Sequence, residues 1–284
     1  MLFMSLQVSF RCFQLTILKQ GARCRYRSKL PYKSTRSRRR PAAKPLSRGS
    51  GKQEMKNVIL LQLPPSERAA VFSKLEFMQL PVHTVLNEMA EPIKFCYFIN
   101  TGLASILNVM SDGKTVEVGL AGKEGFVGLP LIVGFDTSPT QTLIQIAATG
   151  FRISGKELLD CLRDCPVLEK SLNRYSQELA LQVTMVAACN RLHEVEHRLA
   201  RWLLMSQDRV ESPSFLLTQE FLAHMLGTRR ASVTVAAGIL QKAGLITYKR
   251  GNVTILNRAE LQDASCECYL QLDSQIKNWH NRLR

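Results

Sequence analysis

The stretch that most constrains the fold is LTQEFLAHMLGTRRASVTVAAGILQKAGLI, residues 217–246, which has the pattern of two short helices joined by a tight turn. Thr218 can cap a first helix. The apolar residues of that helix fall on one side at helical spacing: Phe221, Leu222, Met225 and Leu226. Gly227 ends it, because glycine takes a positive φ at no steric cost. Ala223 is small where a second helix must cross closely, as in a helix-turn-helix.

The second helix is expected from about Arg229 to Lys242. Its core-facing residues recur at three-four spacing: Val233, Ala236, Ala237 and Leu240. Its free face carries one long basic side chain beside small and β-branched ones: Arg230, Ala231, Thr234 and Val235. Between residues 217 and 250 five basic residues (Arg229, Arg230, Lys242, Lys249 and Arg250) stand against one acid, Glu220. Such a face suits a polyanion.

The following segment, GLITYKRGNVTIL, alternates into two short strands around Arg250-Gly251-Asn252, which predicts the β-hairpin wing of a winged helix. Arginine can grip guanine in the major groove, while helix starts and lysines hold phosphates. The candidate DNA contacts lie on the two helices and the wing: Thr218, Gln219, Arg229, Arg230, Ser232, Thr234, Lys249 and Arg250. The alternative is a three-helix packing unit whose charges are merely solvated.

With these residues the chain resembles the bacterial Crp/Fnr regulators over roughly residues 58–268. The resemblance implies an α+β fold in which an N-terminal β-roll, jelly-roll-like and similar to cyclic-nucleotide-binding domains, is joined by a long dimerisation helix to a C-terminal winged helix-turn-helix. It implies double-stranded DNA, a second copy of the chain and RNA polymerase as partners. It predicts a cytoplasmic protein that is not an enzyme and does not associate with membranes.

The net charge of +15 suggests a nucleic-acid partner, but it is concentrated in a leader. Residues 1–55 hold 14 Lys or Arg and one acid, Glu54, whereas 24 basic and 22 acidic residues share the rest. This Arg-, Ser- and Pro-rich leader is expected to be disordered. It could be a basic arm for DNA, a transit peptide or, as we favour, a stretch outside the translated protein. The sequence contains no run of about eighteen apolar residues, so no membrane-spanning helix is predicted.

Residues 63–78 predict a short amphipathic helix opened by Pro64 and Pro65. Afterwards the period changes to two, and glycine-separated runs predict a closed or rolled β-domain: HTVLNE, KFCYFIN, LASILNVM, TVEVGLA, FVGLPLIV, TLIQIAA and FRIS. Asp112-Gly113 marks a hairpin between two of these runs.

The nucleotide pocket of the resembled family is degenerate in this sequence. In cyclic-nucleotide-binding members a Phe-x-Gly-Glu run supplies a ribose contact and a later arginine the phosphate contact. Here the first run is Phe126-Val127-Gly128-Leu129, and the later position reads Ser138-Pro139-Thr140. A buried phosphate without its arginine lacks the charge-assisted bonds that offset desolvation. We therefore expect no usual cyclic-AMP binding; the pocket near Gly128, Leu129, Pro139 and Thr140 has an unknown effector or none, and no cofactor is predicted.

After a short helix and Pro166, an apolar stripe continues to about Asn190 in steps of four and three: Leu168, Leu172, Tyr175, Leu179, Gln182, Val186 and Cys189. The stripe fits either a coiled-coil seam or a helix lying on its own β-roll. The resemblance favours the dimer.

Residues His193-Glu194-Val195-Glu196-His197 satisfy the H-E-x-x-H pattern of zinc proteases. A structural hinge is favoured, because Leu192, Val195, Leu199, Trp202 and Leu203 are expected to form the buried stripe and no third ligand is evident. No metal ligand is predicted. The eight cysteines indicate a reducing compartment rather than a disulfide framework. Cys12 and Cys24 do not match the iron–sulfur ligands of oxygen-sensing members. The pairs Cys161-x3-Cys165 and Cys266-x-Cys268 could be thiol sensors, although buried, inert thiols are commoner.

The sequence thus predicts a homodimeric regulator that binds an inverted-repeat operator. The alternatives are a zinc metallopeptidase acting through His193-Glu194-x-x-His197, and a non-DNA cyclic-nucleotide signalling module. Five segments are expected: a leader (1–55), a β-roll sensor (56–165), the dimerisation helix and hinge (166–206), the winged helix-turn-helix (207–268) and a tail (269–284).

Overall fold

The computed structural model describes residues 54–282. The predicted leader, with Cys12 and Cys24, lies outside these residues apart from Glu54 and Met55. The described residues all belong to one unit, residues 42–284. None of their helices is both long and apolar enough to cross a membrane.

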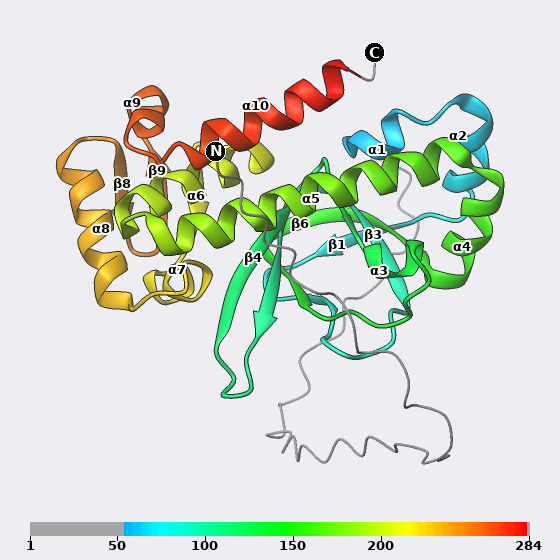
Figure 1. Ribbon diagram of the computed structural model, residues 1–284, viewed down its shortest axis with the longest axis horizontal. Coiled ribbons are helices and arrows are strands. Elements are labelled where there is room, and N and C mark those ends of the chain that lie inside the picture. Colours follow the sequence, from blue (N-terminus) through cyan, green and yellow to red (C-terminus); the bar gives the residue numbers. More distant parts are fainter. Residues whose placement is uncertain (1–53, 283–284) are drawn as a thin grey trace, which may run out of the picture. The chain divides into compact units, whose positions relative to one another are not determined.

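The N-terminal part is a six-stranded antiparallel sheet built on two long strands, β3 and β6 (Figure 1). The strands are β1 (Glu76–Leu80), β2 (Val85–Asn87), β3 (Phe95–Val109), β4 (Thr115–Ala121), β5 (Phe126–Val127) and β6 (Gln141–Ser154). Their order is β1-β6-β3-β4, with β2 on β6 and β5 on β3. The α+β fold with an N-terminal β-domain is confirmed.

The two long strands, β3 and β6, each span two of the separate strands that the sequence predicted. β3 runs through Gly102 (φ 78°) and β6 through Gly150, and the β3–β6 register shifts beside both glycines. A Cβ at residue 102 would lie 2.4 Å from the Ala147 oxygen, so only glycine fits where the strands bend closely together. The Asp112-Gly113 hairpin is confirmed between β3 and β4, with Gly113 at φ 82°.

The helix predicted at residues 63–78 is shorter than expected. Within this range the helix is α2 (Pro65–Phe72), a separate short helix α1 (Val58–Leu61) precedes it, and residues 76–80 form β1 instead. The prediction failed because Phe77 and Met78 fit both periods, and pairing with Gly150 and Phe151 of β6 decides for the strand. FVGLPLIV likewise becomes the two-residue β5 followed by α3 (Leu129–Ile132).

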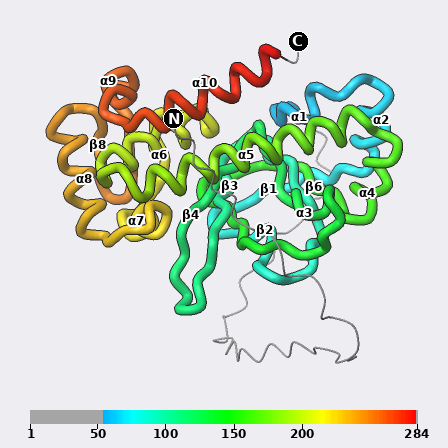
Figure 2. Tube along the Cα trace, viewed as in Figure 1, coloured from blue at the N-terminus to red at the C-terminus, as the bar shows by residue number. Residues whose placement is uncertain are grey.

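Helices α4 (Gly155–Asp164) and α5 (Pro166–Leu192) follow the β-roll, and α5 lies across it (Figure 2). The apolar stripe of α5 is buried within its own chain. Leu168, Leu172 and Tyr175 join the core around Phe98 and Phe126. Gln182 binds the backbone of Leu120 on β4 twice, accepting from its N–H at 2.7 Å and donating to its oxygen at 3.2 Å. The stripe is therefore an intramolecular contact, and its interpretation as a dimer seam is wrong.

The C-terminal part begins with α6 (Val195–Val210), whose Leu199, Trp202 and Leu203 are buried as predicted. The prediction is wrong for Leu192, which is 74% exposed, and Val195 is only partly buried, because the two residues flank the break between α5 and α6. The remaining elements are β7 (Ser214–Leu216), α7 (Gln219–Met225), α8 (Arg230–Lys242), β8 (Ile246–Lys249), β9 (Asn252–Ile255), α9 (Arg258–Asp263) and α10 (Cys268–Asn281). Strands β7, β9 and β8 form a second sheet in that order. Helix α10 returns alongside α5, where His280 Nε2 and Glu178 Oε1 are 2.6 Å apart (Figure 1).

The H-E-x-x-H residues do not form a zinc-protease site. His193 is the C-cap of α5 and His197 lies in α6, so the break between the two helices keeps the two histidines off a shared helix. His197 Nδ1 lies 2.8 Å from the Ala264 oxygen, whereas His193 lies against Glu267 and Cys268. A zinc protease needs both histidines one turn apart on one helix face, which this geometry does not provide.

Candidate nucleic-acid interface

The predicted first helix and its turn are confirmed. Thr218 Oγ1 caps α7 by accepting from the Phe221 N–H at 3.1 Å. Gly227 ends the helix at φ 57°, and the Thr228 N–H donates to the Ala223 oxygen at 2.9 Å. With the Gly227 N–H bonded to the His224 oxygen at 3.2 Å, this is a Schellman C-cap. The glycine thus fixes where the chain turns into the second helix.

Helix α8 has the two faces that the spacing predicted. Val233, Ala236, Ala237 and Leu240 are each at most 2% exposed and pack in the C-terminal core. On the other face Arg230, Ala231, Thr234 and Val235 are exposed, Val235 by 64%. Thr234 Oγ1 donates to Gln219 Oε1 at 2.9 Å or to the Arg230 oxygen at 3.0 Å. The exposed start of α8 is therefore braced by the first residue of α7.

The wing is confirmed as a hairpin whose turn places two residues at positive φ. Arg250 has φ 52° and Gly251 has φ 79°, the combination of a type I′ turn. Tyr248 fixes the wing to the helices: its hydroxyl donates to the Leu217 oxygen at 2.6 Å, and its N–H donates to Gln241 Oε1 at 2.9 Å. Burial raises the pKa of Tyr248 to about 12, so this hydroxyl keeps its proton at neutral pH.

Four of the predicted contact residues meet in one hollow of about 320 Å³ between the helices and the wing. Its lining consists of Thr218, Gln219, Arg230, Tyr248, Arg250 and Gly251. Lys249 is exposed on the adjacent strand β8, next to the wing turn. The sequence analysis missed Tyr248, whose place in a short strand gives no sign of its structural role, and β7, whose three residues are too few to show a period.

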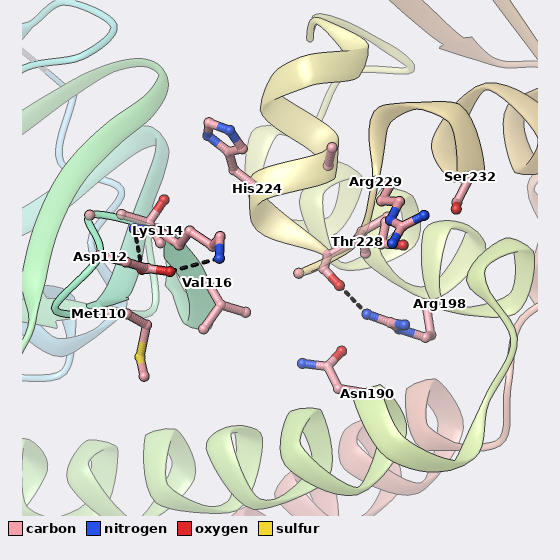
Figure 3. Close-up of a pocket in the computed structure, with 15 residues that line it drawn as sticks. Met110, Asp112, Lys114, Val116, Asn190, Arg198, His224, Thr228, Arg229 and Ser232 are labelled. Carbon is pink, nitrogen blue, oxygen red and sulfur yellow. Dashed lines mark hydrogen bonds and ion pairs between the residues drawn. The ribbon is translucent and has the colours of Figure 1, made fainter.

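Arg229 and Ser232 line a different cavity, of about 1130 Å³, between the helix-turn-helix and the β3–β4 hairpin. In Figure 3 Asp112 and Lys114 of the hairpin stand on one side, and Thr228, Arg229 and Ser232 on the other. Asp112 is paired with Lys114 at 2.6 Å. The structure therefore places four of the eight predicted residues in the hollow at the wing and two in the cavity that faces the chain's own β-roll. Thr234 and Lys249 line neither.

The basic residues of this region have no acidic partners. Within the described residues, Arg229, Arg230, Lys242, Lys249 and Arg250 make no ion pair, and all five are exposed. Unpaired cations on an exposed helix start and wing remain available to phosphates.

The degenerate pocket residues of the β-roll also have defined places. Gly128 precedes α3 at φ 122°, and Leu129 is the first residue of that helix. Pro139 is exposed, and the flanking Ser138 hydroxyl donates to the Thr140 oxygen at 2.8 Å. This hydroxyl is thus occupied within its own turn.

A buried polar group unforeseen from the sequence joins the β-roll to α6. Glu117 on β4 accepts from Trp202 Nε1–H at 2.8 Å and from the Ser105 hydroxyl at 2.7 Å. Burial is the largest cause that raises the pKa of Glu117, to about 7. A single carboxylate among alternating strand residues gives no hint that it will face a tryptophan 85 residues away.

These features define a class: a β-roll joined by a long helix to a winged helix-turn-helix. Residues 197–264 match the Crp-like helix-turn-helix domain. No curated protein sequence matches the chain significantly.

Solved structures share most of this fold at low sequence identity. A putative transcriptional regulator of the Crp/Fnr family from Eubacterium rectale aligns with a TM-score of 0.59 and 15% identity, over 74% of this chain and 98% of that one. The c-di-GMP-responsive global regulator CLP of Xanthomonas campestris gives 0.58 and 18%, over 68% and 100%. FixK2 of Bradyrhizobium japonicum gives 0.59 and 14%, over 68% and 98%. The chain thus carries a Crp-like helix-turn-helix on the fold of the Crp/Fnr transcription regulators, as the sequence resemblance implied.

Proposed function

We propose that this protein is a sequence-specific DNA-binding transcription regulator and that α8 is its recognition helix. One observation carries the proposal: the exposed face of α8 begins with unpaired arginines and is flanked by a wing with two more cations, while its opposite face is fully buried. Arg230 is the long donor that suits guanine, and Ala231 and Val235 offer methyl contacts to thymine. RNA polymerase is the expected protein partner of such a regulator.

In the proposed complex, cations of the helix start and the wing hold phosphates. Arg250 lies at the hollow with Thr218 and Gln219, and Lys249 lies beside it, so both can follow a backbone strand that passes there. Arg229 and Ser232 face the cavity toward the β3–β4 hairpin. DNA contact by these two requires room between the hairpin and the bound duplex.

The proposed regulator acts as a homodimer through the outer face of α5. Ala180, Thr184 and Ala187 are exposed and recur at four and three residues, so they form one stripe on the side away from the β-roll. Small side chains let two helices approach closely. A two-fold dimer places its two recognition helices about one DNA turn apart, and the operator is then an inverted repeat.

The effector is not expected to be cyclic AMP, because Leu129 and Pro139 stand where the resembled pocket has charged contacts. The direct test of the function is selection by the purified full chain from fragments of its own genome, followed by footprinting of the retained fragments. The proposal expects a shared inverted repeat protected on both half-sites. Uniform retention of all fragments, abolished by heparin, would show only polyanion binding and contradict it.

A further inference from the structure

Three cysteines and a histidine from distant parts of the sequence meet beside the break between α5 and α6. Cys189 lies in the last turn of α5 and His193 directly follows that helix, while Cys266 and Cys268 lie at the start of α10. Their ligand atoms all lie within 4.8 Å of one another. We infer that Cys189, His193, Cys266 and Cys268 bind one zinc ion as a tetrahedral Cys3His site.

The distances fit a single ion. Cys189 Sγ and Cys266 Sγ are 3.4 Å apart, and Cys268 Sγ lies 3.6 Å from His193 Nδ1. Zinc binds thiolate sulfur at about 2.3 Å, and tetrahedral geometry then separates two sulfurs by roughly 3.8 Å. A cluster of several irons would hold its thiolates farther apart, because each thiolate binds a different iron. A disulfide between Cys189 and Cys266 would leave Cys268 and His193 without a role.

The three thiols form a small cluster of their own, separate from the apolar cores. Cys189 is fully buried, and Cys266 and Cys268 are only 6% and 5% exposed. Local chain geometry helps to assemble the ligands. Cys189 and His193 are four residues apart at the end of α5, and the Cys-x-Cys segment leads into the first turn of α10, whose first residue is Cys268. Backbone N–H groups at a helix start favour the thiolate form that binds metal.

The histidine is oriented as metal-binding histidines are. Its Nδ1 faces Cys268, while its Nε2 lies 3.2 Å from the carboxylate of Glu267. A ligating histidine usually donates its second ring N–H to a carboxylate, which fixes the tautomer and strengthens the ligand. Glu267 sits between the two cysteines of the Cys-x-Cys segment, so that segment supplies two ligands and the carboxylate that orients the third.

Two buried arginines, Arg198 and Arg201, also favour a negatively charged group at the site. Arg201 is 4% exposed and Arg198 is 7% exposed, and no carboxylate in the described residues pairs with either. Among the residues that the structure describes, Arg201 Nη1 has Met205 Sδ as its partner at 3.2 Å, Arg198 Nη2 donates to the Leu226 oxygen, and the Nε of each arginine has no partner. An unpaired buried cation is costly. Three thiolates with one Zn²⁺ carry a net charge of −1 beside these arginines. On binding, the thiols release their protons to solvent and their sulfur lone pairs bind the ion, so no oxidant or reductant is needed.

The site fastens the end of α5 to the start of α10, across 77 residues of chain between Cys189 and Cys266. That segment contains α6 and the winged helix-turn-helix, so the ion clamps the connection between the β-roll and the DNA-binding part. The match to the Crp-like domain ends at residue 264, two residues before Cys266. The clamp is therefore an addition beyond the matched domain.

Metal analysis of the full chain tests the inference without reference to DNA. The wild-type protein, purified without chelators from zinc-supplemented cells, should contain one zinc per chain by inductively coupled plasma mass spectrometry. His193→Ala and Cys268→Ser should each lose it. Cys161→Ser, at a buried thiol elsewhere in the chain, is the matched control and should keep it. Glu267→Gln should weaken zinc affinity about 10–100-fold, as removal of such an orienting carboxylate does.

Cobalt titration keeps the test decisive if a variant folds poorly. Metal-free wild-type protein with unchanged helical circular dichroism should take up one Co²⁺ and show thiolate charge-transfer and tetrahedral visible bands. A folded wild-type chain with neither zinc nor these bands would overturn the inference. So would iron with acid-labile sulfide, a Cys189–Cys266 disulfide in freshly purified protein, or zinc retained by the His193→Ala/Cys268→Ser double variant.

Discussion

The buried carboxyl of Glu117 should make the folded chain less stable as the pH rises. The residue Glu117 is 6% exposed, and its carboxyl lies between Trp202 and Ser105. Ser105 also contacts the Gln145 carbonyl oxygen, and one hydroxyl proton cannot serve both acceptors. A protonated Glu117 resolves this, because its O–H can donate to Ser105 while Ser105 donates to Gln145. Burial raises the pKa of Glu117 to about 7, although the hydrogen bonds from Ser105 and Trp202 act to lower it.

The magnitude follows from the difference between the folded and unfolded pKa. The ordinary value is 4.5, and between 4.5 and about 7 the folded chain holds a proton that the unfolded chain lacks. The free energy of unfolding therefore falls as pH rises through this window, by about 1.4 kcal/mol per unit and about 3 kcal/mol in total. Glu117→Gln keeps the shape and removes the titration. It should be neutral below pH 4.5 and should stabilise the chain by up to about 3 kcal/mol above pH 7.

Urea unfolding of both proteins at a series of pH values from 4 to 8 measures this difference directly. The exposed Glu91→Gln is the matched control, since it removes the same charge outside this cluster, and it should leave the profile unchanged. A difference between Glu117→Gln and wild type that stays constant with pH would refute the reasoning, because it would show that the pKa of Glu117 is the same in the folded and the unfolded chain.

Three further predictions concern assembly, the sensor and DNA affinity. Ala187→Glu on the exposed stripe of α5 should give folded monomers by sedimentation, and a dimeric Ala187→Glu protein would disprove the proposed interface. Leu179→Glu should instead lower the free energy of unfolding by about 1–3 kcal/mol, because Leu179 packs on Gly119. Calorimetry with cyclic AMP should show no saturable binding at micromolar concentration, and a titratable isotherm would mean that the pocket was misread. Arg229→Gln and Lys249→Gln should each weaken binding to all DNA alike and reduce the salt slope by about 1; an unchanged slope would remove them from the phosphate contacts.

Helix caps and turns could be predicted from the sequence, because they depend on a few neighbouring residues. Thr218, Gly227 and the Arg250-Gly251 turn act through their own backbone geometry, so the helix-turn-helix and its wing could be placed closely. The stripe of α5 shows the limit of this approach. Its periodicity states that one face is buried but not against what, and the covering surface is the chain's own β4.

Long-range juxtapositions were not predictable. Glu117 and Trp202 are 85 residues apart, and the pairs Cys189 with Cys266 and His193 with Cys268 are 77 and 75 apart. The H-E-x-x-H pattern drew attention to His193 for a reason that the helix break removes, while its partners are the cysteines that the sequence analysis left as inert thiols or sensors. The cysteine–histidine group is assembled by the packing of α10 on α5, and the Glu117–Trp202 pair by the packing of α6 on the β-roll. Neither contact has a local signal in the sequence.

Base readout by Arg230 is the most direct test of the central claim. Binding of the full chain to the selected operator, to the operator with its proposed guanine changed, and to random DNA should be measured by fluorescence anisotropy at one salt concentration. Arg230→Ala should lose about 1–3 kcal/mol of discrimination between the first two DNAs. Arg163→Ala, which removes the same charge from α4, should keep it. If Arg230→Ala discriminates as well as the wild type, α8 does not read the sequence through this residue, and the assignment of the recognition face is contradicted.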